Sequence, residues 1–97
     1  MTRNEHLLTC VIEECAEIQQ AAAKALRFGL ENGHPSSCTT NADDIAHEVC
    51  DLTAVLDLLK DAGAITYDKP QATVAIARKK ETVEKYIDYA KSIGTIQ

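Results

Sequence analysis

Two pairs of carboxylates are the residues of this sequence best suited to chemistry. Glu14 and Glu17 stand three residues apart, and so do Glu48 and Asp51. Residues at that spacing are neighbours on the surface of an α-helix, so each pair presents two carboxylates side by side. Carboxylate oxygens are preferred ligands of hard divalent cations, and Mg²⁺ is the common one at sites that process phosphates. If the two pairs meet, the spacing predicts a metal site.

One member of each pair also occupies a position where a core residue is expected. Apolar residues that recur at alternating spacings of four and three mark the core-facing side of a helix. Glu14 falls within the first such series and Glu48 within the second. The two series are Leu7, Val11, Glu14, Ile18, Ala21 and Ala25, and Ile45, Glu48, Leu52, Val55 and Leu59. A carboxylate without a partner in a core is unfavourable, so both positions require a compensating charge.

Antiparallel packing of the two helices would bring the two pairs together. Four carboxylates around one small volume repel one another unless a cation neutralises them, and Mg²⁺ would do so, with Mn²⁺ as a substitute. The alternative is that all four acids lie on solvated helix flanks, where Glu and Asp usually occur. Glu14 and Glu48 both occupy core-facing positions, and each has an acidic neighbour three residues further along the chain. This combination favours the metal site.

A row of polar residues continues from the first pair along the same helix. Its members also alternate by four and three, and they are Glu13, Glu17, Gln20, Lys24 and Arg27. Lys24 lies seven residues after Glu17, about 10 Å along the helix axis. Cations two turns from a metal site match the layout of a polyphosphate site, because metal and Lys or Arg together neutralise the phosphates. A solvated face with Glu–Lys pairs is the alternative.

Helices are expected to position all of these residues, so the predicted fold class is all-α. The first helix begins after Thr2, which starts a capping box, and runs to about Phe28. The second begins near Thr40 or Asn41, both good N-cap residues, and ends at Gly63.

A third helix has Pro70 in its first turn and runs to about residue 92. Residues 64–69 form a connector that could hold a short fourth helix. We therefore expect one domain over residues 1–97, a helical bundle of three main helices.

Charge and hydropathy restrict the partners of the chain. A formal net charge of −5 repels nucleic-acid backbones and anionic membranes. No apolar run approaches the roughly 20 residues that cross a bilayer, and the N-terminal residues lack the apolar centre of a secretory signal. We expect a cytoplasmic protein with neither polymeric nucleic acid nor a membrane as its partner.

The apolar residues are too few for a large core within one chain. The sequence has four aromatic residues and no Trp, and small domains bury a smaller fraction of their surface. The third helix nevertheless carries a wide apolar stripe of Ile76, Val83, Tyr86, Ile87, Ala90 and Ile93. We expect oligomerisation, at least to a dimer, to complete the bundle.

The acidic motifs, taken in order, resemble those of a known family. Residues 13–17 read E-E-x-x-E and residues 48–51 read E-x-x-D. The segment 24–29, with the sequence KALRFG, follows the first motif, and a helix led by Asn41 carries the second. These features are similar to the MazG-like family of all-α nucleoside triphosphate pyrophosphohydrolases, over about residues 4–59.

The resemblance implies hydrolysis of a nucleoside triphosphate between its α- and β-phosphates. The residues that would hold magnesium are Glu14, Glu17, Glu48 and Asp51. Glu13 or Glu17 would orient or deprotonate the attacking water. We expect Lys24, Arg27 and Asn41 to bind the substrate. Members of the family associate as dimers or tetramers, which implies a homodimer or homotetramer here.

A role without catalysis is the alternative. The chain could be a metal-binding regulatory module, or an assembly protein whose acids only fix the register of its helices. His6 and His34 are candidates for contact with a nucleobase, and ordinary surface histidines are the alternative reading of both.

Overall fold

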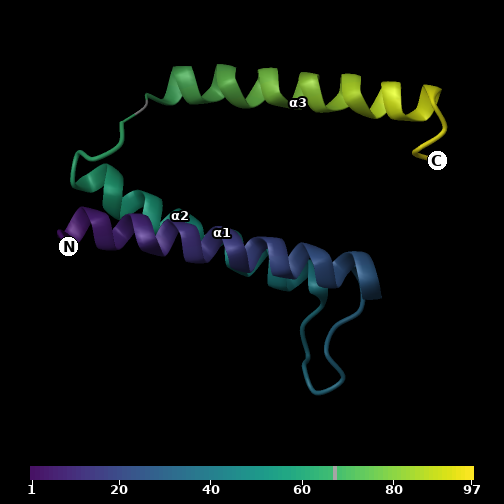
Figure 1. Cartoon of the computed structure of the whole chain (residues 1–97), viewed down its shortest axis with the longest axis horizontal. Coiled ribbons are helices and arrows are strands. Elements are labelled where there is room, and N and C mark those ends of the chain that lie inside the picture. The colour runs from purple at the N-terminus through teal and green to yellow at the C-terminus, as the bar shows by residue number, and fades with distance from the viewer. Residues whose placement is uncertain (67) are drawn as a thin grey trace. The chain divides into compact units, whose positions relative to one another are not determined.

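The structure, a computed structural model, describes residues 1–66 and 68–97 and is helical in class, as predicted. Its three helices are α1 (Arg3–Phe28), α2 (Asn41–Asp61) and α3 (Lys69–Ser92) (Figure 1). Over the described ranges there is no strand and no fourth helix, so residues 64–66 and 68 hold no helical turn. The part of that connector at Tyr67 lies outside the described residues.

Side-chain caps explain where the helices begin. The Thr2 hydroxyl accepts a hydrogen bond from the Glu5 N–H, and the Glu5 carboxylate accepts one from the Thr2 N–H, which is the predicted capping box. Thr40 and Asp43 form the same reciprocal pair at the start of α2, so Thr40 rather than Asn41 is the cap. Asp68 caps α3, a role that the sequence reading did not assign.

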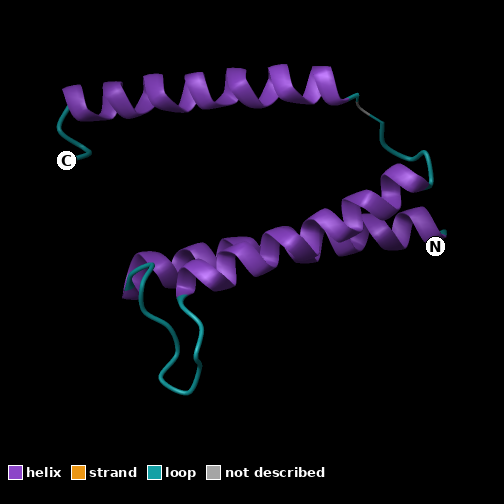
Figure 2. Ribbon diagram, turned by 180° about the vertical axis from the view of Figure 1, so that it is seen from behind, coloured by secondary structure: helices purple, strands orange, loops and turns teal. Residues whose placement is uncertain are grey.

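The helices α1 and α2 pack side by side and antiparallel, as both views of the chain show (Figures 1 and 2). Every member of the two predicted core-facing series is buried or half-buried. Leu59 is the most enclosed, with 1% of its surface exposed. The alternating spacing therefore predicted the α1–α2 interface correctly, including the positions of Glu14 and Glu48.

The loop between α1 and α2 is fastened at both of its ends. Gly29 ends α1 with a positive φ of 93°, and its N–H donates to the Ala25 carbonyl. Where α2 begins, the backbone N–H of Asn41 donates to the Asn32 carbonyl at 2.6 Å, and that of Ala42 donates to the Leu30 carbonyl at 2.9 Å. The loop is thus tied to the first turn of α2.

The chain divides into two compact units, Met1–Ile65 and Thr66–Gln97, and the second unit contains α3. No described residue of α3 is buried. The expected stripe residues Ile76, Val83, Tyr86 and Ile93 are all exposed. The single domain over residues 1–97 and its completion by oligomerisation stay predictions. None of the described helices has the length and apolar character needed to cross a bilayer.

Candidate metal centre

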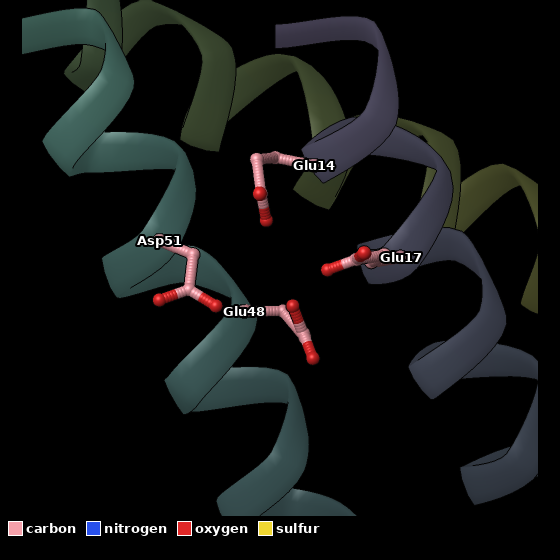
Figure 3. Close-up of side chains that lie close together, drawn as sticks. All are labelled: Glu14, Glu17, Glu48 and Asp51. Carbon is pink, nitrogen blue, oxygen red and sulfur yellow. The ribbon is translucent and has the colours of Figure 1, made fainter. Parts of the chain in front are cut away.

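The four predicted ligands come together in the middle of the α1–α2 pair. Each residue offers one carboxylate oxygen, and these four atoms all lie within 4.8 Å of one another. Figure 3 shows them converging from both helices on a common volume: Glu14, Glu17, Glu48 and Asp51. Antiparallel packing with the observed register is what aligns one i,i+3 pair with the other, as the sequence suggested.

Two oxygens of this cluster are buried without a hydrogen-bond partner. They are Oε2 of Glu14 and Oε2 of Glu48, which belong to the two carboxylates within the core-facing series. The carboxyl group that can hydrogen-bond with both Glu14 and Glu48 is that of Glu17, and it can donate a hydrogen bond only when it carries a proton. A buried polar atom without a partner is unfavourable, so these atoms favour either protonation or a bound cation.

The electrostatics of the cluster favour protonation when no cation is present. Burial raises the pKa of Glu14, and the charge of Glu17 and hydrogen bonding with it add to this effect, followed by the charges of Asp51 and Glu13. Hydrogen bonding with Glu17 raises the pKa of Glu48, assisted by burial and by the charges of Glu17, Asp51 and Glu14. These two half-buried carboxylates therefore resist full ionisation.

The donor set fits a hard divalent cation. All four residues supply carboxylate oxygens, which suit Mg²⁺ or Mn²⁺, whereas sites selective for zinc usually contain Cys or His. A divalent ion would also give the two orphaned oxygens the electrostatic partner that the protein does not provide. The arrangement could accordingly hold a metal ion, and Glu17 is the exposed residue among its four ligands.

A histidine lies beside the cluster on α2. Nε2 of His47 is 3.6 Å from Oδ2 of Asp51, four residues further on, and the His47 side chain is largely exposed. This distance is too long for a hydrogen bond, so the contact is a weak one that depends on the protonation of the imidazole. Glu13, the other predicted catalytic residue, is exposed and contributes no ligand oxygen to the group of four.

A cavity of about 510 Å³ lies at the loop end of the same helix pair. Lys24 and Asn41, both predicted to bind substrate, are among its lining residues. The full set is Lys24, Phe28, Asn32, Gly33, His34, Pro35, Asn41 and Asp44. Arg27 is not in this set, and its guanidinium lies over the Phe28 ring, 5.0 Å from the ring centre.

Asn41 has a structural task besides lining this cavity. Its side chain is 5% exposed, and Nδ2 donates a hydrogen bond of 2.8 Å to the Gly29 carbonyl. The amide therefore connects the start of α2 to the end of α1, twelve residues earlier. No local sequence pattern predicts this long-range hydrogen bond.

The sequence reading also missed most of the cavity. Phe28, Asn32 and Asp44 were not assigned to any site, and His34 was only an open candidate. One signal was available for Asp44, which precedes Asp51 by seven residues and so lies two helical turns away on the same side of α2. The loop residues offer no such periodic signal.

The chain was compared with protein-family models, with curated proteins and with solved structures, and none of the three comparisons gives a match. The likeness to the MazG-like family is therefore carried by the two acidic motifs and their surroundings alone.

Proposed function

We propose that this chain is a magnesium-dependent nucleoside triphosphate pyrophosphohydrolase of the MazG-like kind, which cleaves its substrate to the monophosphate and pyrophosphate. The observation that supports this proposal most is the group of four carboxylates with two buried, unpartnered oxygens. A purely structural acidic cluster would have no reason to leave such atoms within a core-facing series. The proposed compartment is the cytoplasm, where nucleoside triphosphates are abundant.

In this proposal Glu14, Glu17, Glu48 and Asp51 hold Mg²⁺, with Mn²⁺ as a substitute. The bound metal would neutralise charge on the phosphoryl oxygens and on the leaving pyrophosphate. Glu17 is the exposed member of the group, so solvent water can reach its carboxylate, which would orient that water or take its proton. Glu13, exposed and one residue before Glu14, is the second candidate for this role.

Two of the proposed substrate-binding residues are cationic. Lys24 lines the cavity and Arg27 lies over the ring of Phe28, so both are near the loop end of the helix pair. Lys24 forms no ion pair with any described residue, which leaves its charge free for a phosphate. For Asn41 we propose a contribution through the shape of the cavity, because its amide is already bonded to Gly29.

Incubation of the purified chain with a panel of nucleoside triphosphates and magnesium, followed by product analysis, tests the proposal. We expect monophosphate and pyrophosphate, and no products after chelation. Glu48→Gln removes one charge at nearly constant volume and should lower turnover by orders of magnitude. The matched control is Glu84→Gln on α3, an exposed acid outside the cluster, which should retain full activity. Equal activity of the two variants would refute the ligand assignment.

A metal-binding module without turnover would give a different pattern. Magnesium would then raise the melting temperature of the wild type, but not that of Glu48→Gln, and no nucleotide in the panel would be cleaved. An assembly protein whose acids only fix helix register would show neither the thermal shift nor cleavage.

We also propose that the working unit is a homodimer or homotetramer. Support comes from α3, whose apolar stripe has no buried member in the described chain. At about 25 cal/mol per Å² of apolar area, pairing of such stripes between chains would add substantially to the stability of the fold. Two-fold symmetry is the commonest closed arrangement and would give two identical sites.

A further inference from the structure

The cavity at the loop end and the carboxylate cluster lie on the same side of the α1–α2 pair. On α1, Lys24 of the cavity follows Glu17 of the cluster by seven residues, and on α2, Asp44 precedes Asp51 by seven. A step of seven residues rotates about 20° short of two full helical turns and advances about 10 Å along the helix axis. Because the helices are antiparallel, both steps lead from the cluster toward the loop. One ligand about 10 Å long could therefore occupy both places.

The cavity is not built to bind a phosphate group. The free N–H groups of a helix N-terminus are the usual backbone site for a phosphate. At α2 the first three N–H groups are already used: that of Asn41 bonds to Asn32, that of Ala42 to Leu30 and that of Asp43 to the Thr40 hydroxyl. The two ionic lining residues, Lys24 and Asp44, carry opposite formal charges, so the lining has no net positive charge, although Lys24 forms no ion pair with any described residue and can still contact a phosphate at the edge of the cavity.

The lining residues suit a planar, neutral ring instead. Phe28 lines the cavity, and the Arg27 guanidinium over its ring restricts the motion of that ring. The side-chain amide of Asn32 bonds to the Phe28 carbonyl at 2.6 Å, which holds the loop beside the ring. Aromatic side chains in such settings stack on nucleobases.

The cavity also offers polar groups for the edge of a base. Nδ1 of His34 accepts a hydrogen bond from the backbone N–H of Ser36 at 3.1 Å. Since that nitrogen accepts, the proton of the neutral imidazole is on Nε2, which is then a donor. Asp44 supplies acceptor oxygens, one of which receives the Thr39 hydroxyl. A donor and an acceptor among the lining residues match the mixed hydrogen-bonding edge of a nucleobase.

We infer that this cavity holds the nucleobase of the nucleotide, with Phe28 stacking on the base, while the carboxylate cluster binds the phosphates. This inference rests on the proposed function, because it takes the ligand of the cluster to be a nucleoside triphosphate. It adds the place of the base, which the acidic motifs do not indicate. The size is adequate, since ligand cavities are usually about 300–1,000 Å³.

Binding measurements that do not depend on turnover test the inference. The probes are α,β-methylene analogues of the four ribonucleoside triphosphates and inorganic tripolyphosphate, which has no base, all with magnesium. We expect at least one analogue to bind about 10-fold more tightly than tripolyphosphate. Phe28→Ala should remove this difference without weakening tripolyphosphate binding. The control is Leu26→Ala on the same helix, 89% exposed and outside the cavity, which should behave as the wild type.

A second measurement uses the unmodified chain. The ring resonances of His34 should shift when an analogue binds and stay unchanged with tripolyphosphate, whereas those of His6 should shift with neither. The inference is overturned if no analogue binds more tightly than tripolyphosphate, or if Phe28→Ala and Leu26→Ala have the same effect. Because Phe28 is 58% exposed, its replacement should leave the fold intact, which the melting temperature checks.

The outcomes separate this inference from the proposed function. Cleavage of triphosphates with no effect of Phe28→Ala would overturn the place of the base and leave the proposed function standing. Tight, Phe28-dependent binding without any cleavage would overturn the proposed function and support the nucleobase site.

Discussion

Replacement of Asn41 by alanine distinguishes a residue that shapes the cavity from one that contacts the substrate. The change removes the hydrogen bond from Nδ2 to the Gly29 carbonyl, measured at 2.8 Å. Its net contribution is about 1 kcal/mol. The carbonyl keeps only a long contact of 3.4 Å with the Asn32 N–H, so part of the cost of an unsatisfied buried group is added. We therefore expect a total loss of about 1–2 kcal/mol.

For a folding unit of this size, 1 kcal/mol corresponds to about 4–8 °C in melting temperature. The expected fall for Asn41→Ala is accordingly about 4–16 °C, measured by circular dichroism at 222 nm. The control is Asn4→Ala in the first turn of α1, an exposed position where a change of less than about 0.5 kcal/mol is expected.

Ligand binding supplies the second half of the test. A cavity-shaping role predicts that Asn41→Ala loses stability and weakens the nucleotide analogues, while tripolyphosphate binds as before. A melting temperature equal to that of Asn4→Ala, combined with weaker nucleotide binding, would refute this reasoning. It would indicate that Asn41 contacts the substrate directly.

Three further predictions concern the cluster, the loop and the assembly. Because the pKa values of Glu14 and Glu48 are raised, the folded state binds more protons than the unfolded state above the ordinary Glu pKa of 4.5. The stability of the metal-free protein should therefore fall as pH rises above that value, and it should fall less in Glu48→Gln. Added magnesium should reverse this dependence of stability on pH. A melting temperature that rises with pH in the presence of a chelator would contradict the prediction. Gly33→Ala should lower the free energy of unfolding by about 1–3 kcal/mol and weaken the binding of the analogues, because the added Cβ would overlap the Thr39 carbonyl oxygen. Unchanged binding would indicate that the loop does not need its observed conformation to form the cavity. Light scattering at micromolar concentration should give at least twice the 10.6 kDa of one chain, and a monomeric mass for the active protein would exclude the proposed assembly.

The sequence predicted the α1–α2 pair in detail because periodicity carries that information. Spacings of four and three locate the side of each helix that packs, and Glu14 and Glu48 stood out as carboxylates within apolar series. Once the two helices are antiparallel, their i,i+3 partners Glu17 and Asp51 can lie close by, and the four oxygens within 4.8 Å agree with this. The cluster was therefore predictable as a whole.

The loop and its cavity could not be predicted in the same way. The hydrogen bonds from Asn41 to Gly29 and from Ala42 to Leu30 join residues twelve apart, and no local pattern encodes them. The partner of the α3 stripe could not be predicted either: Ile76 and Tyr86 are exposed in the single chain, and the expected pairing between chains stays a prediction. Periodicity shows that a face is apolar but does not identify what covers it.

The hydrogen bonds that tie the loop to α2 make the sequence of the loop independent of the packing of α1 against α2. The backbone bonds from Ala42 to Leu30 and from Asn41 to Asn32 close the loop below its tip. Residues 33–39 therefore form an excursion whose length and composition can vary without shifting the register of α1 against α2, since lengthening a surface loop adds little free energy. The register of the two helices aligns the four carboxylates, so their geometry would persist through such changes. Insertions and deletions in this segment are thus a route by which variants of this chain could acquire different ligand preferences while retaining the same metal chemistry.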